Sequence, residues 1–422
     1  MDNSNETQLL KHYRPLSNAA GFGSMLGSGI IVTLASTITV WQKGLQLTNS
    51  QVGIISGILT FAIAFGSLFG GKIAESIGLI KSFNWINLFY AIGAALCVLS
   101  NGFWMLVCGV TICGFTSGMD LPVSLAVVSH DAPDKEISNK LVAFTQVYWQ
   151  IGAMSSVAAA FIVSKVQGDL GARIVFGVLT LVALITWAWR TFSPTFRQFH
   201  IAGDARWNEL KNEKEEMPKA SVVKVLFGSD KKYLRYFSLI MLFYVLWNLL
   251  ANTWGQFGTF MLVKAHASQS IATGSGVVIG FVGILVTAWF SKVSSGKSRN
   301  PAFIVGSLIS FVAYVILGLF GTHLTGIITA NVFTTVGGAL AGEAMYKVWT
   351  QESFPVDVRA SIQGIINGTS RLACALFAFV TPALVIPARI QTTMWVFSGL
   401  VILYLIAAII MMRAQKNNGV EE

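Results

Sequence analysis

The chain has 422 residues, of which 54% are hydrophobic and only 11% are charged, with a formal net charge of +10. A soluble domain carries about 25% charged residues, so this composition excludes a water-soluble globule and indicates an integral membrane protein. The 4 cysteines and 5 histidines have no metal-ligand spacing, so neither a metal site nor a disulfide framework is expected.

Apolar runs long enough to cross a bilayer divide the chain into two similar halves. A transmembrane helix needs about 20 such residues, and twelve runs approach or exceed that length. We therefore predict an all-α membrane protein with two six-helix bundles, residues 1–192 and 236–422, joined by a cytoplasmic linker at 193–235. The predicted spans are 19–41, 51–70, 83–100, 104–129, 141–164, 173–192, 236–262, 272–291, 301–320, 324–350, 361–385 and 391–412.

The distribution of lysine and arginine predicts the orientation. Cytoplasmic loops of membrane proteins are enriched in these residues. With the N-terminus inside, 22 of the 29 bases fall on the cytoplasmic side and 5 outside, so both termini are expected in the cytoplasm. The positive charge therefore needs no nucleic-acid partner. The remaining bases, Lys347 and Arg371, fall within predicted spans.

The two halves also resemble each other in sequence. The fourth span contains "SGMDLPVSLAVVSHDAP" and the tenth contains "AGEAMYKVWTQESFP". Each has an acid after a glycine, Asp120 or Glu343, and a proline 12 or 13 residues later. Paired six-helix repeats are the layout of a secondary transporter whose substrate site lies near the midplane.

Three further motifs carry a family resemblance. "GGKIAESIG" contains Glu75, "ESFPVDVRASIQG" contains Glu352 and Arg359, and "GTSRLACA" contains Arg371. On these motifs the chain resembles a transporter of the major facilitator superfamily, in the branch of sugar porters and metabolite:proton symporters. The segment "YKVWTQESFP" most resembles bacterial inositol-transporter-like sugar porters.

The resemblance implies a secondary active transporter and not an enzyme. It would import a small polyhydroxy solute, a sugar or inositol, with protons by alternating access, as a monomer in the inner (plasma) membrane bilayer. The chain has no G-x-x-x-x-G-K-[ST] motif, so we expect the proton gradient and no cofactor to drive it. The first alternative is an organic-anion:proton symporter that uses Arg371 and Lys347 as carboxylate clamps; an efflux carrier and a non-transporting sensor are the others.

Asp120 and Glu343 are the candidates for proton coupling. An ionised acid within the bilayer is costly unless it faces protein or water. Asp120 has no base nearby in the sequence, so we rank it first and expect a partner from elsewhere, such as Arg371, or capping by Ser124 or another neighbouring hydroxyl. Glu343 is four residues before Lys347, on one helix face; the two form either a structural pair or a substrate or proton site.

Amide and aromatic side chains mark the expected solute path, since amides donate and accept hydrogen bonds, as hydroxyl-rich solutes require. The resemblance implies that Gln146, six residues before Gly152, contacts sugar. The alternative is that the amides join helices and the tryptophans anchor at the interfaces. The predicted substrate-binding residues are Gln146, Trp149, Gln150, Asn248, Asn252, Asn367 and Arg371.

The gate residues follow from the resemblance. Glu352 and Arg359 are expected to pair at the cytoplasmic mouth and, with Glu75, to hold the inward side shut. A single exposed pair contributes only about 0–1 kcal/mol, so a gate needs several contacts or partial burial. In the first half, His130 and Ile137 replace the acid and the arginine of this motif.

Overall fold

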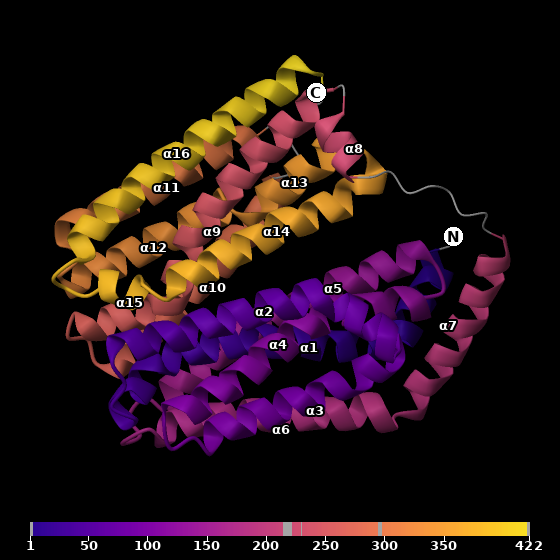
Figure 1. Cartoon of the computed structure of the whole chain (residues 1–422), viewed down its shortest axis with the longest axis horizontal. Coiled ribbons are helices and arrows are strands. Elements are labelled where there is room, and N and C mark those ends of the chain that lie inside the picture. Colours follow the sequence, from indigo (N-terminus) through magenta and orange to yellow (C-terminus); the bar gives the residue numbers. More distant parts are fainter. Residues whose placement is uncertain (1–2, 214–221, 229, 294–297, 420–422) are drawn as a thin grey trace. The chain divides into compact units, whose positions relative to one another are not determined.

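The computed structural model is built of α-helices and describes residues 3–213, 222–228, 230–293 and 298–419 (Figure 1). The helices gather into two compact units, the first containing α1 to α7 and the second α8 to α16. Each unit has its own packed interior, so each is described by itself.

The first unit is built around α4. Both α2 and α3 pack along α4, and α1 packs along α5. Gly66 of α2 and Gly118 of α4 meet the facing backbone directly, which is the close approach that small residues allow in membrane helices. The helices are α1 (Asn3–Gly44), α2 (Asn49–Ile77), α3 (Leu79–Val98), α4 (Phe103–Asp131), α5 (Lys135–Ile162), α6 (Leu170–Phe192) and α7 (Pro194–Glu213).

The second unit has α9 in contact with most of its neighbours. It packs against α14 and α16 most extensively, and α12 packs against α10 and α11. The helices are α8 (Val222–Phe227), α9 (Lys232–Lys264), α10 (Gln269–Val293), α11 (Arg299–Phe320), α12 (Leu324–Leu340), α13 (Glu343–Ser353), α14 (Val356–Ala378), α15 (Thr381–Leu384) and α16 (Ile390–Asn417).

Ten stretches of the described residues are helices long and apolar enough to cross a membrane, with α12 and α13 together forming one of them. The chain is therefore a membrane protein with many spans. α5 and α14, of 28 and 23 residues, are not among the ten. The count of twelve spans and the cytoplasmic position of both termini stay predictions.

The N-terminal segment is more helical than its polar composition suggests. The first span was predicted to begin at residue 19, but α1 begins at Asn3 and continues through Pro15. Its early turns are covered by α7: Tyr13 stacks on Phe199 with ring centroids 4.9 Å apart, and Leu16 is fully buried. Tertiary packing therefore extends this helix beyond the membrane-length apolar run.

Candidate functional site

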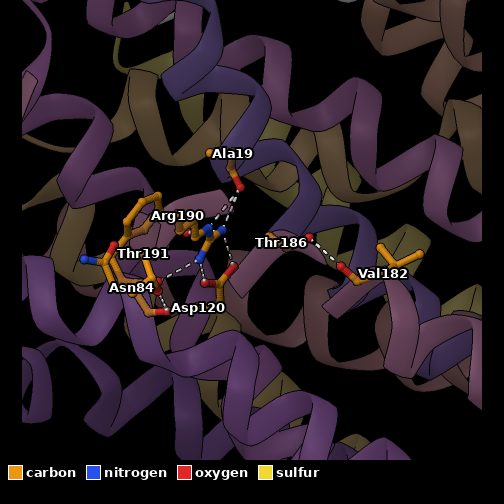
Figure 2. A network of polar contacts seen from close by, with 9 residues as sticks. Ala19, Asn84, Asp120, Val182, Thr186, Arg190 and Thr191 are labelled. Carbon is orange, nitrogen blue, oxygen red and sulfur yellow. Dashed lines mark hydrogen bonds and ion pairs between the residues drawn. The ribbon is translucent and has the colours of Figure 1, made fainter. Parts of the chain in front are cut away.

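A buried ion pair connects α4 and α6 in the first unit (Figure 2). Arg190 donates to the two carboxylate oxygens of Asp120 at 2.6 and 3.4 Å, and these side chains are 0% and 3% exposed. The guanidinium also donates to the Ala19 and Phe83 carbonyls and to the Ser124 hydroxyl at 2.7 to 3.2 Å. Because Ala19 lies on α1 and Phe83 on α3, one arginine joins four helices.

These contacts correct the environment predicted for Asp120. We expected a partner from a distant part of the sequence, such as Arg371; the partner is distant in sequence, but it is Arg190 of the same unit. Arg190 was counted among the cytoplasmic bases, whereas it is buried. Of the expected hydroxyls, Ser124 bonds to the arginine instead of to Asp120. The role of Asp120 in proton coupling stays a prediction.

The absence of a side chain at Gly23 of α1 makes room for this ion pair. A Cβ at Gly23 would overlap Asp120 Oδ2 and lie 2.6 Å from Arg190 Nη2. The first unit therefore closes tightly around two opposite charges. A buried pair of this kind is costly to desolvate, and its intact geometry is what makes it tolerable.

The tenth predicted span is interrupted, contrary to the prediction of one helix over 324–350. α12 ends at Leu340 and α13 begins at Glu343, with Gly342 outside helical geometry at φ −120° and ψ −144°. A Cβ at Gly342 would lie 2.5 Å from the Trp247 ring of α9. Interrupted membrane helices offer unpaired main-chain N–H and C=O groups, and transporters place them at their substrate and ion sites.

Glu343 and Lys347 form the predicted pair on α13. Their side chains meet at 2.8 Å, and they are 49% and 42% exposed. Glu343 also lies in the first turn of α13, where the helix dipole favours a negative charge. The second unit therefore presents a half-exposed carboxylate at the helix interruption.

Aromatic rings surround this interruption. Tyr244 of α9 stacks on Tyr346 of α13 with centroids 3.8 Å apart, and on Trp247 with centroids 5.9 Å apart. Further along α9, the Trp254 indole donates to Asn331 of α12. Tyr244 and Tyr346 are buried, whereas Trp247 and Trp254 are half-buried, so the two indole rings are the ones that suit the apolar face of a sugar or cyclitol ring.

A cavity of about 210 Å³ lies beside Trp247, between α9, α11, α12 and α16. It combines aromatic rings with hydroxyl groups, which offer both apolar contact and hydrogen bonds. Its lining includes Trp247, Trp254, Tyr314, Tyr404, Ser310, Thr334 and Thr335.

The predicted amides of the second unit form hydrogen bonds between α9 and α14 or within α9. Asn248 donates to Ser370 at 2.6 Å, and Asn367 accepts from Tyr244 at 3.4 Å, so both connect α9 with α14. Asn252 accepts from Gln256 on α9 at 3.0 Å. Each amide retains further donor or acceptor capacity, so helix joining and solute binding are compatible. Their predicted role in solute binding stays a prediction.

The predicted residues of α5 lie in the first unit. The Trp149 ring lies against Gly27 of α1, where a Cβ would be 3.3 Å from the ring. Gln150 is exposed, and the side chain of Gln146 lies outside the described residues. Arg371 of α14 is half-buried in the second unit, where it is close enough to Glu343 to interact electrostatically.

The predicted gate pair of Glu352 and Arg359 is wrong in its partners. Glu352 accepts two hydrogen bonds from Arg299 at 2.5 and 2.9 Å, while Arg359 donates to the Phe354 carbonyl at 2.6 Å. The Arg299–Glu352 pair therefore links α11 to α13, and Arg359 of α14 bonds to the residue that ends α13. Glu75 is exposed at the end of α2, and the gating role of all three predicted residues stays a prediction.

The first unit has its own polar cluster where α4 ends. Asp131 is fully buried and contacts His130 at 2.7 Å and His200 of α7 at 2.5 Å. Arg206 donates to the Asp131 carbonyl at 2.6 Å. The sequence motif placed His130 at the position of the expected acid. The acid that pairs with the histidines is the next residue, Asp131, so a shift of one residue concealed it in the sequence.

The comparisons with known proteins agree with this helical arrangement. The family model described as Major Facilitator Superfamily matches residues 18–378. The chain belongs to the major facilitator superfamily. It is 27% identical over 399 residues to the minor myo-inositol transporter IolF of Bacillus subtilis, covering 91% of this chain and 87% of that protein.

Solved structures show the same fold. The D-xylose-proton symporter superposes with a TM-score of 0.75 at 16% identity, covering 93% of this chain and 96% of the other. The inward-open xylose transporter XylE from E. coli gives a TM-score of 0.73 at 15% identity and 94% coverage of both chains. The family assignment makes the chain a membrane transporter and not an enzyme.

Proposed function

We propose that this major facilitator transporter imports a small polyhydroxy solute, a sugar or an inositol, together with protons across the plasma membrane by alternating access. Its similarity to IolF over most of both chains supports an inositol-like solute. The similarity in fold to a proton symporter supports the coupling mechanism.

The observation that carries the proposal is the interruption of α12 and α13 at Gly342. It brings together a main-chain break, the half-buried ring of Trp247, which stacks on Tyr244, and the accessible carboxylate of Glu343. A polyol ring needs an apolar surface on its face and donors and acceptors around its edge. These groups supply both within one unit.

Within this proposal Glu343 is the group that takes up the proton, ahead of Asp120. A coupling carboxylate must exchange its proton with water during transport. The Glu343 side chain is 49% exposed, whereas that of Asp120 is 3% exposed and bonded to a permanently charged arginine. Asp120 then serves to hold the first unit together.

The test is uptake into proteoliposomes of radiolabelled inositol, sugars and organic acids, with and without an imposed inward proton gradient. For Glu343→Gln we expect at least a tenfold loss of gradient-driven accumulation with solute exchange retained, because exchange needs no net proton release. Asp230→Asn, an exposed acid before α9, is the matched control and should accumulate like the wild type. Full accumulation by Glu343→Gln would refute the coupling assignment.

The alternative substrate class is an organic anion. Lys347 and Arg371 both lie near Glu343, and a niacin transporter of Acinetobacter baylyi is 26% identical over 156 residues, covering 36% of this chain and 35% of that protein. If the uptake panel shows accumulation of organic acids alone, and Arg371→Ala abolishes it, the anion assignment replaces the polyol assignment.

A further inference from the structure

An apolar groove lies in the first unit between α2 and α3, and its lining includes none of the residues assigned to transport. Its volume is about 920 Å³. α2 and α3 contact each other little but each packs along α4, so α4 provides its floor. Its lining includes Ile58, Phe61, Phe65 and Ile77 of α2, Trp85, Ile86 and Phe89 of α3, and Ile112, Phe115 and Met119 of α4.

The walls of this groove are open to the surroundings. Phe65, Ile77, Trp85 and Phe89 are all among the exposed large hydrophobic residues. These helices meet the criteria for membrane spans, and exposed apolar side chains on such helices suit contact with hydrocarbon. Its aromatic walls provide a long surface on which an acyl chain packs.

One end of the groove is polar. Lys81 and Ser82, in the first turn of α3, line the groove together with the apolar residues. Lys81 is exposed. Ser82 is only 5% exposed, and its hydroxyl has no hydrogen-bond partner among the described groups. A buried hydroxyl without a partner is costly, so a ligand atom that bonds to it is favoured.

The backbone adds to this polar end. Gly78 joins α2 to α3 at φ +108° and provides no side-chain cap for α3. The first N–H groups of a helix have no partner within it, and the helix dipole makes this end attractive to anions. A cation, a hydroxyl donor and an uncapped helix start therefore converge where the apolar groove ends.

We propose that this groove binds one anionic phospholipid, with an acyl chain between α2 and α3 and the phosphate at Lys81 and Ser82. The apolar lining selects a lipid over free phosphate. Lys81 forms no ion pair with an acid among the described residues, so it selects an anionic headgroup. Basic pockets at the ends of membrane helices bind anionic lipid headgroups in this way. The bound lipid bridges two helices that otherwise make few contacts.

The test measures lipid binding to the purified full-length protein in detergent, by native mass spectrometry and by the shift in melting temperature. Dioleoyl phosphatidylglycerol is compared with dioleoyl phosphatidylcholine, which has the same acyl chains. We expect the anionic lipid to bind at least fivefold more tightly and to raise the melting temperature more. Equal binding of the two lipids would overturn the proposal.

The variants separate the headgroup contacts from general surface charge. Lys81→Gln and Ser82→Ala should each weaken phosphatidylglycerol binding about fivefold, the effect of roughly one headgroup contact. Lys72→Gln changes an exposed lysine of α2 that does not line the groove, and it should bind like the wild type. An equal loss in Lys72→Gln, or no loss in either groove variant, would refute the site.

Two more measurements identify the ligand. Ile112→Trp fills the groove floor and should abolish preferential binding while leaving Lys81 in place. Sodium phosphate alone should not shift the melting temperature, and a shift equal to that of the lipid would assign the site to free phosphate instead. Neither readout depends on transport, so failure here is separate from failure of the proposed function.

Discussion

The two units treat the same kind of intramembrane acid in opposite ways. Asp120 lies within α4, a continuous helix of 29 residues that includes Pro122, and is sealed by Arg190. Glu343 begins a new helix at an interruption that has no proline, and its side chain is half-exposed beside Lys347. Related sequence positions thus yield a structural clamp in one unit and an accessible charge in the other.

The contrast arises from partners distant in sequence. Arg190, the partner of Asp120, lies far from it in the sequence, while Lys347 is one helical turn from Glu343. A buried pair is strongly destabilised by removal of one partner, whereas an exposed pair contributes little. Stability measurements on the two pairs should therefore differ sharply.

The largest effect is expected for Arg190→Ala, which leaves Asp120 buried without a counter-charge. We expect a loss of about 3–5 kcal/mol in the free energy of unfolding, measured as a fall in melting temperature of the purified protein. The double variant Asp120→Leu/Arg190→Leu should recover much of this loss, because no buried charge remains. An Arg190→Ala variant with the melting temperature of the wild type would contradict a stabilising role for the Arg190–Asp120 pair.

Gly23→Ala should follow, since its Cβ would overlap Asp120 Oδ2. Forcing a methyl group into a filled interior costs about 1–3 kcal/mol. Gly177→Ala on α6 is the matched control, because a Cβ there meets no atom within 4 Å. Equal melting temperatures for the two variants would show that α1 does not need this close approach.

Glu343→Gln and Lys347→Gln should change stability by less than about 1 kcal/mol each, because this pair is exposed to about half its surface. Their melting temperatures should stay close to that of the wild type even where transport is lost. A loss comparable to that of Arg190→Ala would mean that the second pair is also a structural clamp.

The smallest effect concerns Asp169, which lies just before α6. Arg173 donates to Asp169 at 2.7 Å, and this hydrogen bond holds the pKa of Asp169 below its usual 3.8. A group whose pKa is lower in the folded state stabilises the protein at pH values above its unfolded-state pKa. This stabilisation is lost as the pH falls through the folded-state pKa. The stability advantage of the wild type over Asp169→Asn, at most about 1 kcal/mol, should therefore shrink as the pH falls below the usual pKa of 3.8. A difference in melting temperature between the two proteins that does not change with pH would contradict this.

The sequence predicted what local pattern determines. Apolar length located the helices, and the Glu343–Lys347 pair was correct because a separation of four residues places both on one helix face. Arg190, within the predicted span 173–192, carried a usable signal: a permanent charge inside a span requires a partner. Which acid it would meet depends on how α4 and α6 pack, and no local rule contains that information.

The same reasoning explains the other differences. The predicted partner of Glu352 was the nearest arginine along the motif, but Arg299 is brought to it by the packing of α11 against its neighbours. The interruption at Gly342 has no proline to announce it, and the Trp247 ring that occupies the space of a side chain comes from α9. Contacts between helices that are distant in the sequence determined the partner of Asp120, the partner of Glu352 and the interruption at Gly342.

The interruption at Gly342 has a consequence for engineering selectivity. The amide hydrogens that begin α13 and the carbonyl oxygens that end α12 belong to the polypeptide itself, and every amino acid except proline provides the same pair. Side-chain replacement around Tyr244 and Glu343 could therefore retune which ring is preferred, while the main-chain bonds to hydroxyl groups would persist through most substitutions. Under the proposed function, new substrate preferences in this protein should arise within the hydroxylated solutes more easily than outside them.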